Sequence, residues 1–160
     1  MKRGGKKGFR RRGRRGEEEA KAWFYRGVAH YGRREFEAAI GDYSQAIELD
    51  PEWAAAYSNR AVAYYMQEKY EEAIADYSRA IELAPDNAAM HYNRGAAYGA
   101  LGRTSEELAD YLRAIELAPD DPNGYYNRGN VHCREGRYEE AIADYSRAIE
   151  LAPQGAEIYT

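Results

Sequence analysis

The residues of this chain best suited to catalysis are a neighbouring histidine and cysteine, His132 and Cys133. A histidine beside a cysteine can activate a thiolate nucleophile, and the two side chains are also the usual ligands of zinc. Adjacent residues on a helix point in different directions, however, and the chain has no second cysteine for a zinc set. Glycine-rich phosphate loops need a strand before them, and no strand pattern is visible. We therefore expect no enzyme activity, no cofactor and no metal site.

Arginine and aspartate recur in a pattern that suits an ion pair. Each of four arginines is followed at the same distance along the chain by an aspartate, the pairs being Arg26 and Asp42, Arg60 and Asp76, Arg94 and Asp110, and Arg128 and Asp144. A planar guanidinium can bind a carboxylate through two parallel hydrogen bonds. The pattern predicts four structural ion pairs, partly buried between two helices. The alternative is that all eight side chains are solvated surface charges.

Asparagine forms a third recurring set, in which Asn59, Asn93 and Asn127 are equally spaced. A carboxamide can both donate to and accept from the backbone of an extended peptide. The three residues are therefore candidates for peptide binding. The alternative is that each asparagine only caps or solvates its own part of the chain.

These recurring side chains belong to a repeat of constant length. Four prolines stand at the same spacing as the asparagines: Pro51, Pro85, Pro119 and Pro153. Such a period indicates one supersecondary unit copied in tandem. The units implied are residues 20–53, 54–87, 88–121 and 122–155.

Each unit reads as two helices joined by a short turn. The segment 70–85, repeated letter for letter at 138–153, has apolar residues at helical spacing and ends at a proline that cannot continue the helix. The segment 54–68 reads as the first helix of its unit. Glycines in the links 101–103 and 135–137 permit a tight reversal. The chain is predicted to form eight antiparallel helices.

The repeated unit resembles the tetratricopeptide repeat (TPR), over about nine tenths of the chain by the family's repeat length. The family's small third position is matched by Gly27, Ala61, Gly95 and Gly129, and its later aromatic position by a tyrosine in every unit. The resemblance implies an all-α, right-handed α-solenoid of antiparallel helix pairs. It also implies a non-enzymatic scaffold or adaptor for protein–protein interaction.

The same resemblance implies a peptide-binding groove along the first helix of each unit. Carried over position by position, its residues are Phe24, Tyr25, Val28, Tyr31, Ser58, Asn59, Val62, Tyr65, Tyr92, Asn93, Tyr126, Asn127 and Asn130. Residues 17–160 carry 14 Lys or Arg against all 27 acids. An aromatic and polar groove on so acidic a body favours an apolar or basic peptide.

Relatives that hold the acidic C-terminal tails of cytosolic chaperones use a carboxylate clamp of lysine, asparagine and arginine. Asn59 matches the middle of that clamp, but Phe24 and Val28 stand before it, and Ala89 and Asn93 stand after it. The register one unit later has these residues in the clamp positions: Ser58, Val62, Asn93, Asn123 and Asn127. Neither register supplies a cation, so we expect the ligand to differ from an acidic chaperone tail.

The third unit departs from the repeat at Glu107, where the other three units have alanine. A carboxylate in this closely packed position would loosen the unit unless a small helix shift carried it to solvent. We expect the shift, which would leave Glu107 solvated.

Residues 1–16 form a separate basic segment with nine Lys or Arg, five Gly and no acid. Because like charges repel and glycine favours an open chain, we expect a disordered arm ahead of the repeat body at 17–155. The arm offers phosphate-binding cations at Lys6, Lys7, Arg10, Arg11, Arg12, Arg14 and Arg15. An RNA- or nucleic-acid-associated adaptor is therefore the alternative function. A nuclear targeting signal, a solubilising tail, an expression remnant and a strap resting on the acidic body are further interpretations.

Residues 156–160 begin a fifth unit and stop. We expect an apolar edge on the last helix around Ile142, Tyr145 and Ile149. The chain would then be either a fragment of a longer array or able to stack end to end with a second copy. A single cysteine and the lack of a long apolar run favour an intracellular, cytoplasmic protein outside the membrane.

Overall fold

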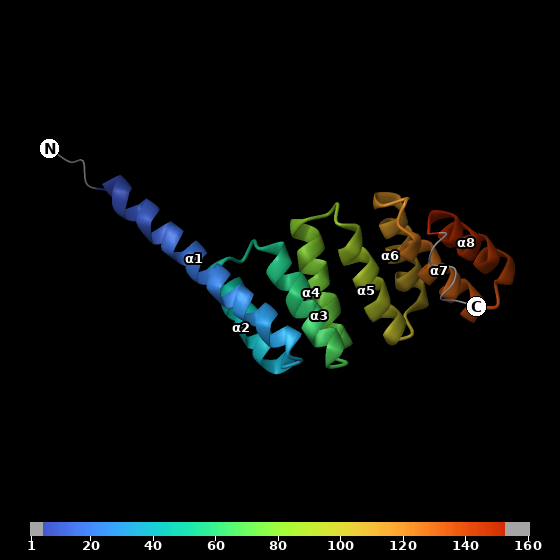
Figure 1. Ribbon diagram of the computed structural model, residues 1–160, viewed down its shortest axis with the longest axis horizontal. Helices are drawn as coiled ribbons and strands as arrows, with labels where there is room; N and C mark the ends of the chain where they lie inside the picture. The colour runs from blue at the N-terminus through green and yellow to red at the C-terminus, as the bar shows by residue number, and fades with distance from the viewer. Residues whose placement is uncertain (1–4, 153–160) are drawn as a thin grey trace. The chain divides into compact units, whose positions relative to one another are not determined.

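The computed structural model describes the backbone of residues 5–152 and the side chains of residues 15–152. This part of the chain consists of helices and short turns (Figure 1), so the predicted all-α fold is confirmed. The helices are α1 Gly5–Gly32, α2 Phe36–Leu49, α3 Ala54–Met66, α4 Tyr70–Leu83, α5 Ala88–Ala100, α6 Thr104–Leu117, α7 Pro122–Arg134 and α8 Tyr138–Leu151. None of these helices combines the length and the apolar character needed to cross a membrane.

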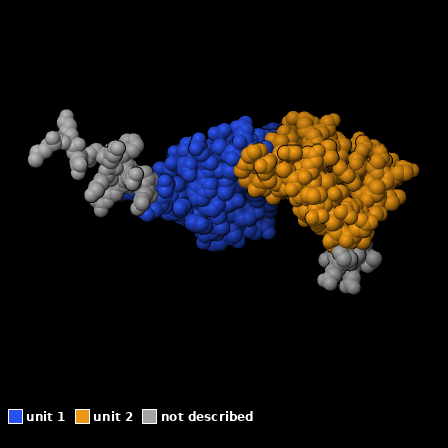
Figure 2. Space-filling view, turned by 90° about the horizontal axis from the view of Figure 1, so that it is seen from above, with its two compact units in different colours: residues 1–83 blue, residues 84–160 orange. Residues whose placement is uncertain are grey.

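The chain divides into two compact units, residues 1–83 and 84–160 (Figure 2). Each unit holds two antiparallel helix pairs: α1 with α2 and α3 with α4 in the first, α5 with α6 and α7 with α8 in the second. Within each unit the pairs are joined side by side, because α2 also packs on α3, and α6 also packs on α7.

The two helices of a pair approach closely because a small residue on the first faces a tyrosine ring on the second. A Cβ atom added to Gly27 would lie 2.8 Å from ring carbons of Tyr43, and one added to Gly129 would lie 2.8 Å from the ring of Tyr145. Real carbon atoms do not approach so closely. The small third position of the repeat is therefore a packing requirement of the pair.

Adjacent pairs within a unit are joined by isoleucines of a second helix that lie under small residues of the next first helix. On α2, Ile47 packs in one cluster with Ala56, and Ile40 packs in another with Ala63. On α6, Ile115 lies under Gly124, where an added Cβ would be 2.7 Å from its side chain. The contact between pairs thus repeats in both units with the same large-on-small arrangement.

The reversal inside each pair is a Schellman turn centred on one residue with positive φ. These residues are Arg34 (63°), Glu68 (60°), Gly102 (70°) and Gly136 (74°). At the first turn the Arg34 N–H donates to the Tyr31 carbonyl, and the Glu35 N–H donates to the His30 carbonyl. The same two hydrogen bonds recur in the other three turns. They satisfy carbonyl groups that the end of a helix leaves unpaired.

The basic segment differs from the expected disordered arm, because α1 extends back to Gly5 and includes most of it (Figure 1). Residues 1–4 lie outside the described part of the chain. Lysine and arginine are good helix formers. Once the packed part of α1 has nucleated the helix, each further residue adds to it at low cost. The side chains of residues 5–14 are outside the described set.

Candidate functional site

All four predicted arginine–aspartate pairs are brought together by the helix pairs. In each, the arginine Nε and Nη2 donate to the two carboxylate oxygens of the aspartate, at 2.5–2.8 Å. The four aspartates are buried. The arginine side chains are 18–24% exposed at Arg60, Arg94 and Arg128, but 55% exposed at Arg26. Hydrogen bonding to the aspartate raises the pKa of each arginine.

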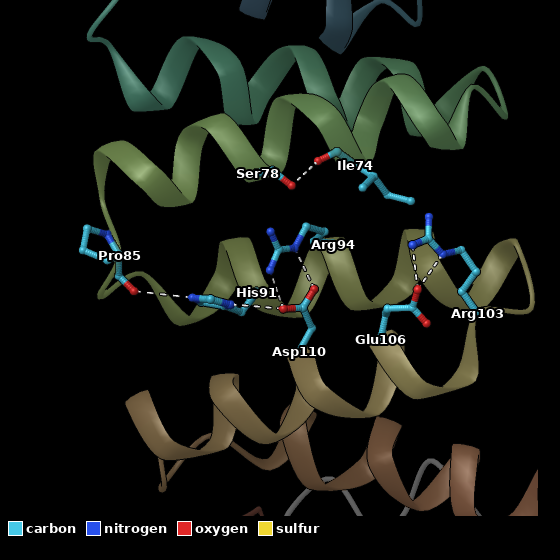
Figure 3. Close-up of polar contacts among 8 residues, drawn as sticks. All are labelled: Ile74, Ser78, Pro85, His91, Arg94, Arg103, Glu106 and Asp110. Atoms are coloured by element: carbon cyan, nitrogen blue, oxygen red, sulfur yellow. Dashed lines mark hydrogen bonds and ion pairs between the residues drawn. The ribbon is translucent and has the colours of Figure 1, made fainter.

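The pair of the third repeat has an additional partner that sequence reasoning missed. His91 Nδ1 lies 3.2 Å from Asp110 Oδ1, and its Nε2 lies 3.4 Å from the Pro85 carbonyl oxygen (Figure 3). Asp110 is therefore in contact with Arg94 and with an imidazole. The signal in the sequence is that His91 occupies a position where the other units have Trp23, Tyr57 and Tyr125.

Glu107 is buried, at 4% exposure, so the expected shift to solvent was wrong. Two features compensate for its burial. Its carboxylate accepts a hydrogen bond of 2.5 Å from Arg134 Nη2 on α7. The space it occupies lies beside Gly99, where an added Cβ would be 2.7 Å from the carboxyl carbon. The first two repeats have Tyr31 and Tyr65 at the position of Gly99. The third repeat therefore has a glycine and a glutamate where these repeats have a tyrosine and an alanine.

In the compact unit of residues 1–83, the proposed groove residues lie on α1 and α3, which are neighbours. Tyr25 is 66% exposed and Val28 is 41% exposed, whereas Phe24, Tyr31, Val62 and Tyr65 are half-buried. Half-buried members are fixed by ring contacts. Phe24 lies 4.4 Å from Trp53 between ring centroids, and Tyr31 lies 5.5 Å from Phe36. The result is an aromatic surface that is partly accessible to a ligand. Its half-buried rings are held in place by their contacts with neighbouring rings.

Two of the three recurring asparagines make hydrogen bonds within the protein. Asn59 bonds to Tyr43, whose pKa burial raises to about 12 despite this bond. Asn127 Nδ2 donates to the Tyr92 hydroxyl at 3.1 Å and to the Asn123 carbonyl at 2.8 Å. Both amide hydrogens of Asn127 are therefore in use, and its carboxamide oxygen remains to accept from a ligand.

In the compact unit of residues 84–160, a hollow of about 280 Å³ lies near the starts of α5 and α7 and is lined partly by Ala89, Tyr92 and Asn123. The helix starts beside it are already capped. Asn87 accepts from the Ala89 N–H, and Asp121 accepts from the Asn123 N–H. One backbone N–H group at each of these helix starts is therefore occupied by a side chain, and the Asp121 carboxylate adds negative charge. The hollow is poorly suited to an anionic ligand.

His132 and Cys133 do not form a catalytic pair. The ring of His132 is buried, while Cys133 is exposed. Burial lowers the pKa of His132, and the adjacent Arg137 lowers it further. Within the described side chains, no group of three His, Cys, Asp or Glu residues is arranged to hold a metal ion.

Stacked antiparallel helix pairs, each locked by a small residue under a tyrosine and by an ion pair, define a helical repeat protein of the kind that scaffolds protein–protein interactions. The tetratricopeptide repeat description matches residues 20–52 and 122–154, and the TPR repeat description matches residues 63–102 and 100–134. The chain belongs to the tetratricopeptide repeat family, whose members are generally non-catalytic scaffolds.

Solved structures share the fold. A crystal structure of MamA is 23% identical, with a TM-score of 0.82, and the match covers 86% of this chain and 81% of that one. The first TPR of Spaghetti (RPAP3), bound to the HSP90 peptide SRMEEVD, is 25% identical with a TM-score of 0.73 and coverages of 75% and 95%. The Arabidopsis OM64 TPR domain is 25% identical with a TM-score of 0.72 and coverages of 74% and 98%. Comparison with curated proteins gives no match.

Proposed function

We propose that this protein is an interaction scaffold that binds a peptide segment along its first helices, and that the peptide is apolar or basic. The observation that carries the proposal is the aromatic surface of α1 and α3, where Tyr25 and Val28 are exposed beside half-buried rings. Rigid aromatic side chains bury a large area on binding and lose little conformational freedom. Asn59 on α3 would add hydrogen bonds to the peptide backbone.

The preference for a basic ligand follows from the charges near this surface. The RPAP3 domain is bound to a peptide with two consecutive glutamates and a C-terminal aspartate. In this chain the positions of the carboxylate clamp hold Phe24 and Val28 in the first repeat, Asn59 in the second, and Ala89 and Asn93 in the third. An acidic peptide would meet no clamping cation at these positions and a net negative repeat body. A peptide with lysine or arginine between apolar residues suits the same surface.

A selection from a phage-displayed library of linear peptides tests the proposal. We expect the full chain to enrich sequences with aromatic or aliphatic residues and a positive net charge. Trp53 fluorescence should change when a selected peptide binds, because this ring contacts Phe24. Enrichment of acidic sequences, or no enrichment, would contradict the proposal.

The matched variants are Val28→Lys and Leu112→Lys. Val28 is exposed on the proposed surface, and Leu112 is similarly exposed on the second helix α6. Both substitutions add one positive charge at an exposed site. Val28→Lys should weaken a selected basic peptide at least about tenfold through like-charge repulsion. Leu112→Lys should leave the affinity nearly unchanged. Equal effects of the two variants would remove the groove assignment.

Nucleic-acid binding through the basic segment is the second candidate, and the continuity of α1 favours it. The helical backbone from Gly5 carries seven Lys or Arg over about three helical turns, at positions Lys6, Lys7, Arg10, Arg11, Arg12, Arg14 and Arg15. A cationic helix can neutralise several phosphates at once. Mixed-sequence RNA should bind the full chain with strong salt dependence and should lose that binding when residues 1–16 are removed. Binding that survives the deletion would exclude the segment.

A further inference from the structure

The last described helix, α8, carries an apolar face that its own unit leaves uncovered. Tyr138, Ile142 and Ile149 are 60%, 64% and 53% exposed. They lie four and seven residues apart, which places them along one side of the helix. Side chains in the same repeat positions of α2, α4 and α6 are less exposed: Ile40, Ile47 and Ile115 are buried, and Ile74, Ile81 and Leu108 are half-buried.

The internal contacts show what kind of surface covers this face. Ile47 packs with Ala56, and Ile40 packs with Ala63, both on the following first helix. Ile115 packs under Gly124 on α7. The cover is therefore the side of a first helix, and on α3 that side presents small residues at two positions seven apart.

α1 offers that same side, and its packing on α2 and α3 leaves this side uncovered among the described helices. Ala22 and Ala29 lie exactly one repeat before Ala56 and Ala63, and both are exposed. Arg26 is 55% exposed, whereas its counterpart Arg60 is 18% exposed. The two ends thus carry the two halves of the contact that joins neighbouring pairs inside the units.

We propose that a second copy of this chain covers α8, through its α1, in an end-to-end contact that repeats the internal one. Ile149 of one copy would lie over Ala22 of the next, and Ile142 over Ala29, as Ile47 lies over Ala56 and Ile40 over Ala63. Charge favours the same pairing. α8 carries four acidic residues and one arginine, while α1 carries nine Lys or Arg and three Glu. Complementary charges speed and orient such an encounter.

One polar contact is specified by the same register. Arg60 Nη1 donates to Ser44 Oγ of the preceding pair at 2.9 Å. Ser44 corresponds to Ser146 on α8, three repeats later, and Ser146 is exposed. In the end-to-end contact Arg26 meets Ser146 of the neighbouring copy. The two faces are unlike, so the contact is heterologous and produces chains or closed rings of copies.

Mixing two blocked variants tests the direction of this contact. Ile142→Glu places a charge on the α8 face, and Ala29→Glu places one on the α1 face. Both sites are exposed, so the variants should melt like the parent chain. In sedimentation, the parent should form species that grow with concentration, and each variant alone should remain monomeric. An equimolar mixture of the two should form a one-to-one dimer through the intact α1 and α8 faces.

Cysteine cross-linking tests the register in the full chain carrying Cys133→Ser. The pair Ile149→Cys with Ala22→Cys should give a ladder of disulfide-linked multimers under mild oxidation. The mismatched pair Ile149→Cys with Ala38→Cys, which uses an exposed alanine of α2, should cross-link at least about tenfold less.

Three outcomes would overturn the proposal. A parent chain that stays monomeric at high concentration has no such contact. An Ala29→Glu variant that still dimerises, while Ile142→Glu does not, indicates two α8 faces packed on each other. Equal cross-linking of the matched and mismatched pairs indicates random collision.

Discussion

The aspartate inside each helix pair is a buried carboxylate whose counter-charge comes from one arginine. Removing a single member of a buried ion pair is costly because the remaining charge has lost both water and partner. Replacing both members with apolar residues is much less costly. The repeats differ in how completely the carboxylate depends on its arginine, since Asp110 also contacts His91, while Asp76 has Tyr57 in the corresponding position.

We predict that Arg60→Leu lowers the free energy of unfolding by about 3–5 kcal/mol, and that Arg94→Leu lowers it less. Asp110 keeps His91 as a partner, whereas Asp76 loses its two hydrogen bonds from Arg60. The double variant Arg60→Leu/Asp76→Leu should recover most of the loss. Urea denaturation measures all three. A double variant no more stable than Arg60→Leu would show that the loss of stability does not come from leaving the Asp76 carboxylate without Arg60.

The burial of Glu107 depends on the absence of a side chain at Gly99. Gly99→Ala should therefore destabilise the protein by about 1–3 kcal/mol, as overpacked cores do. In the background of Glu107→Ala the same substitution should cost almost nothing. Thermal unfolding of the four chains in this cycle gives the coupling between the two positions. Independent, additive effects would mean that the carboxylate moves away from the added methyl group.

Alkaline pH should destabilise the protein through two buried tyrosines. Burial raises the pKa of Tyr43 to about 12 and raises the pKa of Tyr77 above its ordinary 10. The folded state therefore keeps these phenols neutral at pH values where the unfolded chain ionises. Their contribution to stability is fully present below pH 10 and is lost as the pH rises from 10 towards 12.

The measurement is urea denaturation at a series of pH values for the parent and for Tyr43→Phe/Tyr77→Phe. The double variant should lose less stability between neutral and alkaline pH. Tyr138→Phe, at a ring that is mostly exposed, is the control and should follow the parent. Parallel curves for all three chains would be evidence against ionisation of the buried phenols as the cause.

At the scale of elements, the turns between paired helices share one geometry with two kinds of residue. Gly102 and Gly136 adopt positive φ without strain, whereas Arg34 and Glu68 adopt it with a Cβ atom. A residue other than glycine in this region costs about 1–2 kcal/mol, partly offset because glycine loses more freedom on folding.

We predict that Arg34→Gly and Glu68→Gly each raise the free energy of unfolding by about 0.5–1 kcal/mol. Gly102→Ala and Gly136→Ala should each lower it by about 1 kcal/mol. Chemical denaturation of the four single variants tests the pattern. A loss of stability in Glu68→Gly would mean that its side chain contributes more than its backbone conformation costs.

The sequence predicted most of the helices because the period places equivalent residues in equivalent surroundings. Segment 70–85 corresponds to α4 at Tyr70–Leu83, and the arginine–aspartate spacing placed both members of each pair correctly. The exceptions are interactions made by one repeat alone. Arg134 on α7 donates a hydrogen bond to Glu107 on α6, in the preceding helix pair, and the repeat period does not predict this contact. The glycine at position 99 was the available clue. The helical backbone of α1 before Glu17 differs from the expectation, because the glycines and like charges of this segment indicate disorder while continuity with the packed part of α1 favours a helix.

At the scale of the whole molecule, charge is separated along the chain. Nine Lys or Arg lie in residues 1–16, and the remaining 14 face 27 acids. In the proposed end-to-end contact, α1 of one copy packs on the acidic helix α8 of the next, and the basic segment is the N-terminal part of that same α1. Removing residues 1–16 should then weaken the association several-fold at low salt and change it little at high salt, because the apolar contacts remain. Sedimentation of both chains at two salt concentrations decides this. A deletion that weakens association equally at both would point to a non-electrostatic role.

The bond between Glu107 and Arg134 also bears on how such a chain can be rearranged. Each arginine–aspartate pair lies within one repeat, so a repeat excised or duplicated as a cassette carries its own pair. The third repeat is different, since its carboxylate is neutralised by the repeat that follows. The residues corresponding to Arg134 in the earlier repeats are Gly32, Met66 and Ala100. Any shuffled array that places another of these repeats after the third would bury a glutamate without its guanidinium, so this junction fixes the order of its two neighbours.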